Sequence, residues 1–149
     1  MTRLKGKASA MTDTKGRVAL PAKYRKLLPG DLVLTKAPDN VFPALVLFTA
    51  AGFEEWMDEV LASKGGYRAN DKSHDDVIVK YYENAEDVKV DGAGRILIPA
   101  ELRDYARIEK DVIFSGARDH LIVRSLSVWT EYQKHLESVS AYDDPPAQA

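Results

Sequence analysis

The sequence predicts an α+β fold, mainly β, in which two tandem copies of one small unit form a pseudo-dimer. The first observation is an internal repeat: residues 13–25 (DTKGRVALPAKYR) recur as residues 91–103 (DGAGRILIPAELR), with six of thirteen positions identical. The second is that two short aliphatic runs, typical of strands, follow each copy. The third is size, because a unit of roughly 40 residues buries too little surface to be stable alone. Two copies must therefore pack together.

Each copy begins with a turn of the form Asp-x-x-Gly-Arg, whose aspartate can bond its own downstream backbone and whose glycine supplies a positive φ. The motif residues are Asp13, Gly16, Asp91 and Gly94. We expect them to be structural, with carboxylates that can also orient the arginine four residues later. A strand follows at 17–20 or 95–98, and the proline after it suits the first position of a helix. In the first copy this helix spans about two turns before Pro29 and Gly30 end it.

Two further strands are expected in each copy. They lie at 32–35 and 45–48 in the first and at 112–115 and 121–124 in the second, with turns at 39–40 and 119–120. Apolar residues at helical spacing predict a helix that begins near residue 51 and ends at 64–66, and a second helix over 71–85. Trp56 and Trp129 are expected at equivalent positions, as core or interface anchors.

These elements divide the chain into four segments. They are a first repeat over 7–53, a helical connector over 54–84, a second repeat over 85–128, and a C-terminal helix with a disordered tail over 129–149. The tail is acidic and rich in proline, a composition that disfavours a packed structure.

The charge of the chain is strongly asymmetric. The formal net charge is −2, but residues 1–36 contain nine lysines or arginines against two aspartates, a balance of +7, which leaves −9 for the remainder. A basic front on an acidic body is expected of a protein that meets a polyanion with one face. The alternative is a solvated surface with uneven charge.

Several classes of function are disfavoured. The chain has no cysteine, which fits a reducing cytoplasm, and it has neither a signal peptide pattern nor a membrane-spanning apolar run. The spacing of His74, His120 and His135 is not that of metal ligands, and His120 and His135 are expected at the surface. Neither a glycine-rich phosphate loop nor a Ser-His-Asp order is present. We therefore expect a cytoplasmic protein that is not an enzyme, with no cofactor, metal, membrane or small-molecule substrate.

The basic residues of the first copy form the candidate DNA-binding site. They are Arg17, Lys15, Lys5, Lys7, Lys23 and Arg25, with Lys26 nearby and Arg95 as the counterpart of Arg17. Lysine clusters bind phosphates, and arginine can also reach guanine edges. In the second copy Ala93, Glu101 and Asp104 replace lysines, which indicates that the first repeat faces DNA and the second mainly builds structure. Arg25 and Arg103 can instead pair with acids at the edge of the core.

The doubled motif, Asp-x-x-x-Arg within D-x-x-G-R-[aliphatic]-x-[aliphatic]-P-A, resembles the MraZ family from about Leu4 to Tyr132. The resemblance implies two swapped-hairpin units of the AbrB/SpoVT type and a ring-shaped homo-oligomer. It also implies a nucleoid-associated transcriptional regulator that binds direct repeats in double-stranded DNA, upstream of the division and cell-wall gene cluster. It places Arg17 and Arg95 on the DNA-facing surface.

The sequence departs from the family at Leu4, where an aromatic residue is usual, and at Thr12, where an aliphatic one is usual. These changes leave the packing of the N-terminal strand open. A second hypothesis is an AbrB-like oligomeric protein-interaction module whose basic front meets an acidic partner. Preference for repeat-bearing DNA over a scrambled fragment would separate the two hypotheses.

Overall fold

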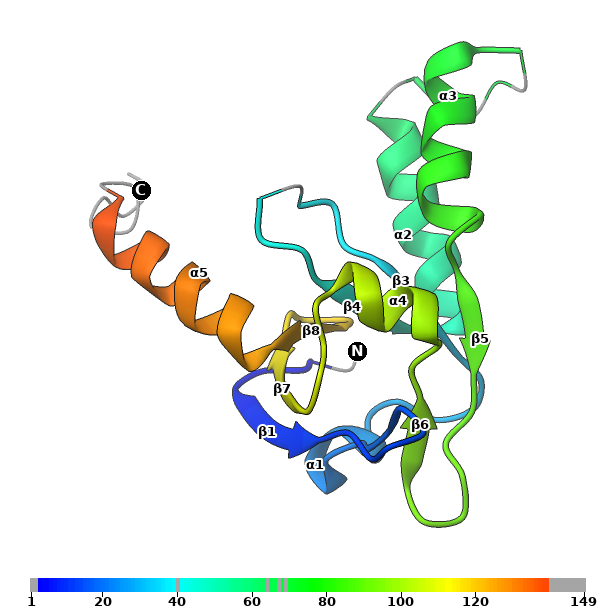
Figure 1. The fold of residues 1–149 in the computed structure, drawn as a ribbon. Helices are drawn as coiled ribbons and strands as arrows, with labels where there is room; N and C mark the ends of the chain where they lie inside the picture. The colour runs from blue at the N-terminus through cyan, green and yellow to red at the C-terminus, as the bar shows by residue number, and fades with distance from the viewer. Residues whose placement is uncertain (1–2, 40, 64, 67, 69, 140–149) are drawn as a thin grey trace.

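The computed structural model describes residues 3–39, 41–63, 65–66, 68 and 70–139 (Figure 1). Its elements are β1 (Lys7–Met11), β2 (Arg17–Ala19), α1 (Ala22–Arg25), β3 (Leu32–Lys36), β4 (Leu45–Thr49), α2 (Ala50–Ala62), α3 (Lys72–Val77), the π-helical η1 (Ile78–Tyr82), β5 (Glu86–Val88), β6 (Arg95–Leu97), α4 (Ala100–Tyr105), β7 (Asp111–Gly116), β8 (Leu121–Ser125) and α5 (Leu126–Ser138). The expected α+β class is confirmed, and the antiparallel strands are compatible with the expected mainly-β fold. Residue 40 of the expected 39–40 turn, residue 64 and the expected tail over 140–149 lie outside the described residues.

Strands from the two halves of the chain interleave in one antiparallel sheet of order β1-β7-β8-β4-β3-β5. The first strand, β1, pairs with β7 of the second half, from Lys7 opposite Ser115 to Met11 opposite Asp111. Reciprocally, β5 of the second half pairs with β3 of the first. The short strands β2 and β6 pair with each other in a separate two-stranded sheet, called the β2–β6 ribbon below.

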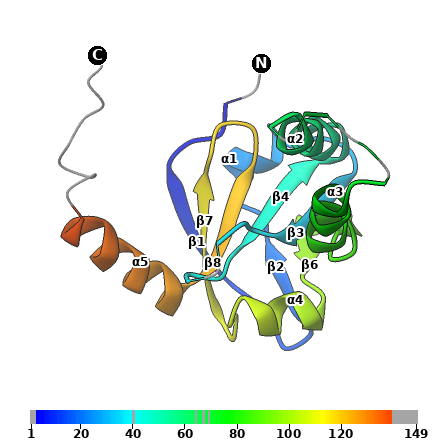
Figure 2. The same ribbon diagram turned by 90° about the horizontal axis from the view of Figure 1, so that it is seen from above.

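The six-stranded sheet has a core on each face. One face packs against the inner side of the ribbon, where Val18 and Ile96 join Leu34 and Phe114 in a single buried cluster. The other face is covered by α2 and by α3 with η1, which stand side by side in Figures 1 and 2. There Phe48 of β4 stacks on Trp56, with ring centroids 5.0 Å apart. Both halves contribute to the first cluster, so they share a core.

Several elements are shorter than the sequence predicts. The strands β2 and β6 stop one residue before the expected bounds. The N–H groups of Leu20 and Ile98 still donate across the ribbon to the carbonyls of Gly94 and Gly16. The N–H groups of these two glycines, however, donate to the carbonyls of Asp91 and Asp13 in their own turns, so these pairs are bonded in one direction only. The helix α1 is a single turn, after which looser turn bonds lead to Leu28. The helix expected over 71–85 consists of α3 and η1. The strand β5 was not predicted, and β1 is the N-terminal strand, whose bounds were not predicted.

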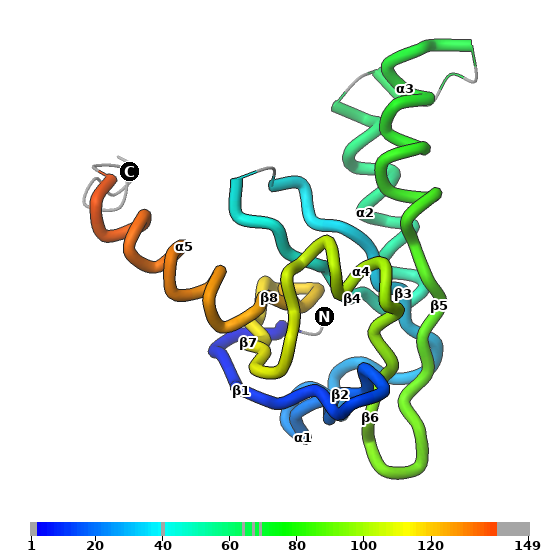
Figure 3. The backbone as a smooth tube through the Cα atoms, in the orientation of Figure 1, coloured from blue at the N-terminus to red at the C-terminus, as the bar shows by residue number. Residues whose placement is uncertain are grey.

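The helices α2 and α5 occupy equivalent places in the two halves. Each has 13 residues and follows a strand directly, and each begins at a hydroxyl cap, Thr49 or Ser125. Counting from these caps, Trp56 corresponds to Tyr132, so the expected equivalence of Trp56 and Trp129 is wrong by one helical turn. Whereas α2 lies beside α3, α5 projects away from the body of the molecule, as the tube in Figure 3 shows. Val128 is its only fully buried residue.

Leu4 and Thr12, the two N-terminal residues that depart from the family pattern, both make contacts with the second half of the chain. Leu4 is buried, and its backbone forms a two-way bridge with Arg118. Gly116 permits this close approach, since a Cβ there would lie 2.3 Å from the backbone nitrogen of Lys5. The hydroxyl of Thr12 donates to the carbonyls of Glu109 and Lys110, at 3.1 and 3.2 Å. A polar residue at position 12 is therefore accommodated.

Candidate nucleic-acid interface

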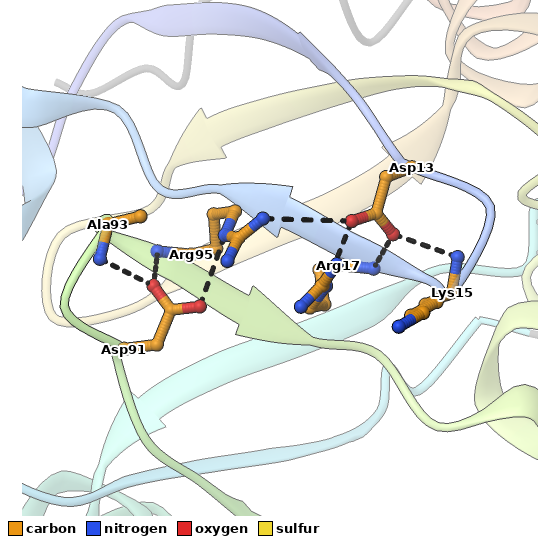
Figure 4. Close-up of polar contacts among 6 residues, drawn as sticks. All are labelled: Asp13, Lys15, Arg17, Asp91, Ala93 and Arg95. Carbon is orange, nitrogen blue, oxygen red and sulfur yellow. Dashed lines mark hydrogen bonds and ion pairs between the residues drawn. The ribbon is translucent and has the colours of Figure 1, made fainter.

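The two Asp-x-x-Gly-Arg segments fold into the same turn. In the first, one carboxylate oxygen of Asp13 accepts the N–H groups of Lys15 and Arg17, both at 2.9 Å, and the other accepts Nε of Arg17 at 2.9 Å (Figure 4). In the second, Asp91 accepts the N–H groups of Ala93 and Arg95 at 2.9 Å and Nε of Arg95 at 3.1 Å. Each carboxylate thus closes its turn and holds its arginine.

These donors keep the two carboxylates ionised. The backbone N–H of Arg17, followed by that of Lys15 and the Arg17 guanidinium, lowers the pKa of Asp13 to about 2. The pKa of Asp91 is lowered by the equivalent contacts, of which the backbone N–H of Arg95 is the largest. Each arginine is therefore anchored by a full negative charge.

The ribbon brings the two motif arginines onto one face. Arg17 lies opposite Leu97, and Ala19 lies opposite Arg95. A terminal nitrogen of Arg95 comes within 3.9 Å of the Asp13 carboxylate, so the two motifs are in electrostatic contact. The sequence assigned the two repeats to different roles, yet their arginines share this ribbon.

A second basic group lies where α1 meets β1. The ammonium of Lys23 donates to the carbonyl of Lys7 at 3.1 Å, and the hydroxyl of Tyr24 donates to the carbonyl of Lys5 at 3.1 Å. Lys5, Lys7 and Lys23 are all exposed. Because β1 runs directly into the turn of Asp13, this group is continuous along the chain with the ribbon and the exposed Lys15.

Comparison with known proteins identifies the family. A family model described as "MraZ protein, putative antitoxin-like" matches residues 81–147. The transcriptional regulator MraZ of Caldanaerobacter subterraneus subsp. tengcongensis is 38% identical over 131 residues, covering 88% of this chain and 87% of that protein. Its counterpart in Mycolicibacterium gilvum is 35% identical over 137 residues, covering 89% and 88%. The chain belongs to the MraZ family.

In this MraZ-family chain the two repeats also support each other's turns. A Cβ on Gly16 would lie 2.6 Å from the guanidinium carbon of Arg103, and one on Gly94 would lie 1.9 Å from a terminal nitrogen of Arg25. Nε of Arg103 donates to the carbonyl of Ile98 at 2.9 Å. Each helix arginine therefore lies against the turn of the opposite repeat.

The suggested pairing of Arg25 and Arg103 with acids is wrong within the described residues, where neither has a carboxylate within 4.0 Å. Sequence reasoning missed the cross-repeat contact, although the recurrence of Gly and Arg nine residues apart in both copies was its signal.

The histidines lie in three separate environments. His74 is buried and accepts the N–H of Arg68 at 2.7 Å, and His135 is exposed. His120 was expected at the surface, but its ring stacks on Phe48 at 4.6 Å and is mostly covered. Among the described residues, no three His, Asp or Glu side chains could together hold a metal ion. In the same residues, no helix is long and apolar enough to cross a membrane.

Proposed function

We propose that this MraZ-family protein is a sequence-specific transcriptional regulator that binds double-stranded DNA with the β2–β6 ribbon. The placement of Arg17 and Arg95 on one ribbon, each held through Nε by an ionised aspartate, carries the proposal. A two-stranded ribbon fits the major groove of B-DNA, where the terminal nitrogens of an arginine can pair with O6 and N7 of guanine. Preorganised arginines lose less side-chain entropy on binding.

The lysines near the ribbon supply the phosphate contacts. Lys15 lies at the tip of the first turn, while Lys5, Lys7 and Lys23 flank it at the start of the chain. Phosphate contacts fix the register of a protein on DNA but do not read its sequence. Arg25 belongs to this surface through its contact with the turn of Gly94.

The interleaved strands support a pseudo-dimer within the chain, and the exposed apolar residues support a larger assembly of chains. The pairing of β1 with β7 and of β5 with β3 supports two swapped-hairpin units of the AbrB/SpoVT type, over 7–53 and 85–128, joined as a pseudo-dimer. Exposed apolar residues, among them Val79 and Leu126, favour further association into a ring-shaped homo-oligomer. Such a ring gains affinity for direct repeats through high effective concentration. We place the protein in the cytoplasm, at the nucleoid, on repeats upstream of the division and cell-wall gene cluster.

The test compares a DNA fragment from upstream of the protein's own gene with a scrambled fragment of equal length. Wild type should prefer the native fragment. Arg17→Ala and Arg95→Ala should each lose that preference by about 1–3 kcal/mol, the usual value of a bidentate base contact. Arg17→Ala should cost more, since Lys15 accompanies it and Ala93 takes that place beside Arg95. The exposed Lys134 on α5 provides the control variant, Lys134→Ala.

Equal binding of the two fragments would contradict sequence-specific recognition. The basic surface would then fit the other hypothesis, an acidic protein partner. A larger loss from Arg95→Ala than from Arg17→Ala, with the assembly intact, would contradict the leading role of the first repeat.

A further inference from the structure

The outer face of the β2–β6 ribbon carries one aliphatic side chain without a place in the core. Side chains alternate along a strand, so the burial of Val18 and Ile96 turns Arg17, Ala19, Arg95 and Leu97 outward. Leu97 is 50% exposed and joins neither buried cluster. Single exposed leucines are common on proteins. The position of this one, directly across the ribbon from Arg17, makes it significant.

We propose that Leu97 is a specificity-determining residue, which contacts the 5-methyl group of a thymine beside the base pair read by Arg17. This inference rests on the proposed function. In the major groove thymine alone among the four bases presents a methyl group, and apolar side chains recognise it. Cross-strand neighbours lie about 5 Å apart. A ribbon that places Arg17 over one base edge therefore places Leu97 within reach of a neighbouring one.

The same residue makes the ribbon directional. The register relates Arg17 to Arg95 and Ala19 to Leu97 by an approximate two-fold axis. A DNA-binding element with two equivalent halves recognises a palindromic sequence, because the symmetry of the site mirrors that of the protein. Leucine on one half and alanine on the other break this equality at the base-reading surface. Each ribbon should therefore prefer an asymmetric sequence, which is the kind that can recur as direct repeats.

The test begins with selection of DNA from a random duplex library by wild type. Each thymine of the enriched sequence is then replaced singly by deoxyuridine, which lacks only the methyl group. We expect one position at which wild type binds about fourfold more weakly, equivalent to about 0.8 kcal/mol for one buried methyl-sized group. Leu97→Ala should bind the unmodified probe at least fourfold more weakly than wild type does. Deoxyuridine at that position should not weaken the binding of this variant further.

Val41→Ala, a comparable truncation of an exposed aliphatic side chain in the loop between β3 and β4, should keep the full response to deoxyuridine. Three outcomes would overturn the inference alone: wild type insensitive to every replacement, Leu97→Ala as sensitive as wild type, or an altered mass of the Leu97→Ala assembly. If wild type enriches no sequence at all, both the proposed function and this inference fail.

Discussion

The glycine of each Asp-x-x-Gly-Arg turn meets two structural constraints, of which the turn itself imposes only one. Gly16 and Gly94 both adopt a positive φ, which alone favours glycine, and both also lie against an arginine of the opposite repeat. The motif predicts the turn and the first of these constraints. It could not predict the second, because that contact depends on how the two repeats pack.

The two constraints on Gly16 can be separated by mutation. Gly16→Ala should lower the free energy of unfolding by about 2–4 kcal/mol, because backbone strain is added to the displacement of Arg103 from Ile98. Gly30→Ala is the control, since φ is +79° there and no atom lies within 4 Å of the new Cβ. Gly30→Ala should lower the free energy of unfolding only by the backbone strain, about 1–2 kcal/mol. Urea unfolding of both variants measures this, and equal losses would contradict a packing role for Arg103.

Asp13 should remain charged in acid. Its pKa is lowered from 3.8 to about 2, so its folded-state contacts contribute stability above about pH 4 and lose it as the pH falls toward 2. The NMR shift of its carboxyl carbon should therefore titrate near pH 2 and stay constant between pH 5 and 8. A midpoint near 4 would show that the donors of Arg17 and Lys15 do not hold the carboxylate in solution.

Among the elements, those with a strong local signal were predicted and those that depend on partners were not. The apolar stripe of α2 and the aliphatic runs of β3, β4, β7 and β8 are visible in the sequence. The strand β5 (Glu-Asp-Val) has no such pattern and exists because β3 offers it an edge. Likewise, the sequence included Arg95 in the basic site only as the counterpart of Arg17 in the other repeat. Their placement on one ribbon could not be predicted, because it depends on the pairing of β2 with β6.

The helices α2 and α5, which occupy equivalent places in the two halves, differ in the contact that their seventh residue after the cap makes. In the first half Trp56 of α2 stacks on Phe48, whereas in the second half Tyr132 of α5 lies over the guanidinium of Arg124, 4.4 Å from its carbon. Arg124 is 8% exposed, and within the described residues its Nε has no hydrogen-bond partner. Burial lowers its pKa, the sign of an unfavourable place for a charge.

Replacing this charge by an apolar side chain of similar length should not destabilise the fold. We expect Arg124→Met to unfold at the same urea concentration as wild type or a higher one, because it removes a buried unsatisfied donor. Arg124→Ala, which also removes the packing against Tyr132, should lose about 1–2 kcal/mol. Destabilisation of Arg124→Met by as much as Arg124→Ala would mean that the charge itself is required.

At the scale of the whole molecule, no helix among the described residues covers α5 as α3 covers α2. Trp129, Tyr132 and Leu136 are only partly buried on α5, although they are among its least polar residues. Apolar surface of this kind on a projecting helix is typical of an interface.

Light scattering after size exclusion should therefore give a mass several times the 16.6 kDa of one chain. Leu136→Asp should lower that mass, because a charge at a buried contact is costly. Glu131→Lys, on the exposed side of the same helix, should leave it unchanged. A wild-type monomer at micromolar concentration would exclude self-association.

The exchange of strands between the halves also determines when the chain can fold during synthesis. Since β1 pairs with β7, and β8 joins β7 to β4, the sheet cannot be completed until Ser125 has left the ribosome. Until then the nascent first half exposes the unpaired edges of β1 and β4, the kind of edge from which aggregation starts. Contacts so distant in sequence also slow folding. The first half therefore stays open to pairing with other chains until most of the protein has been translated.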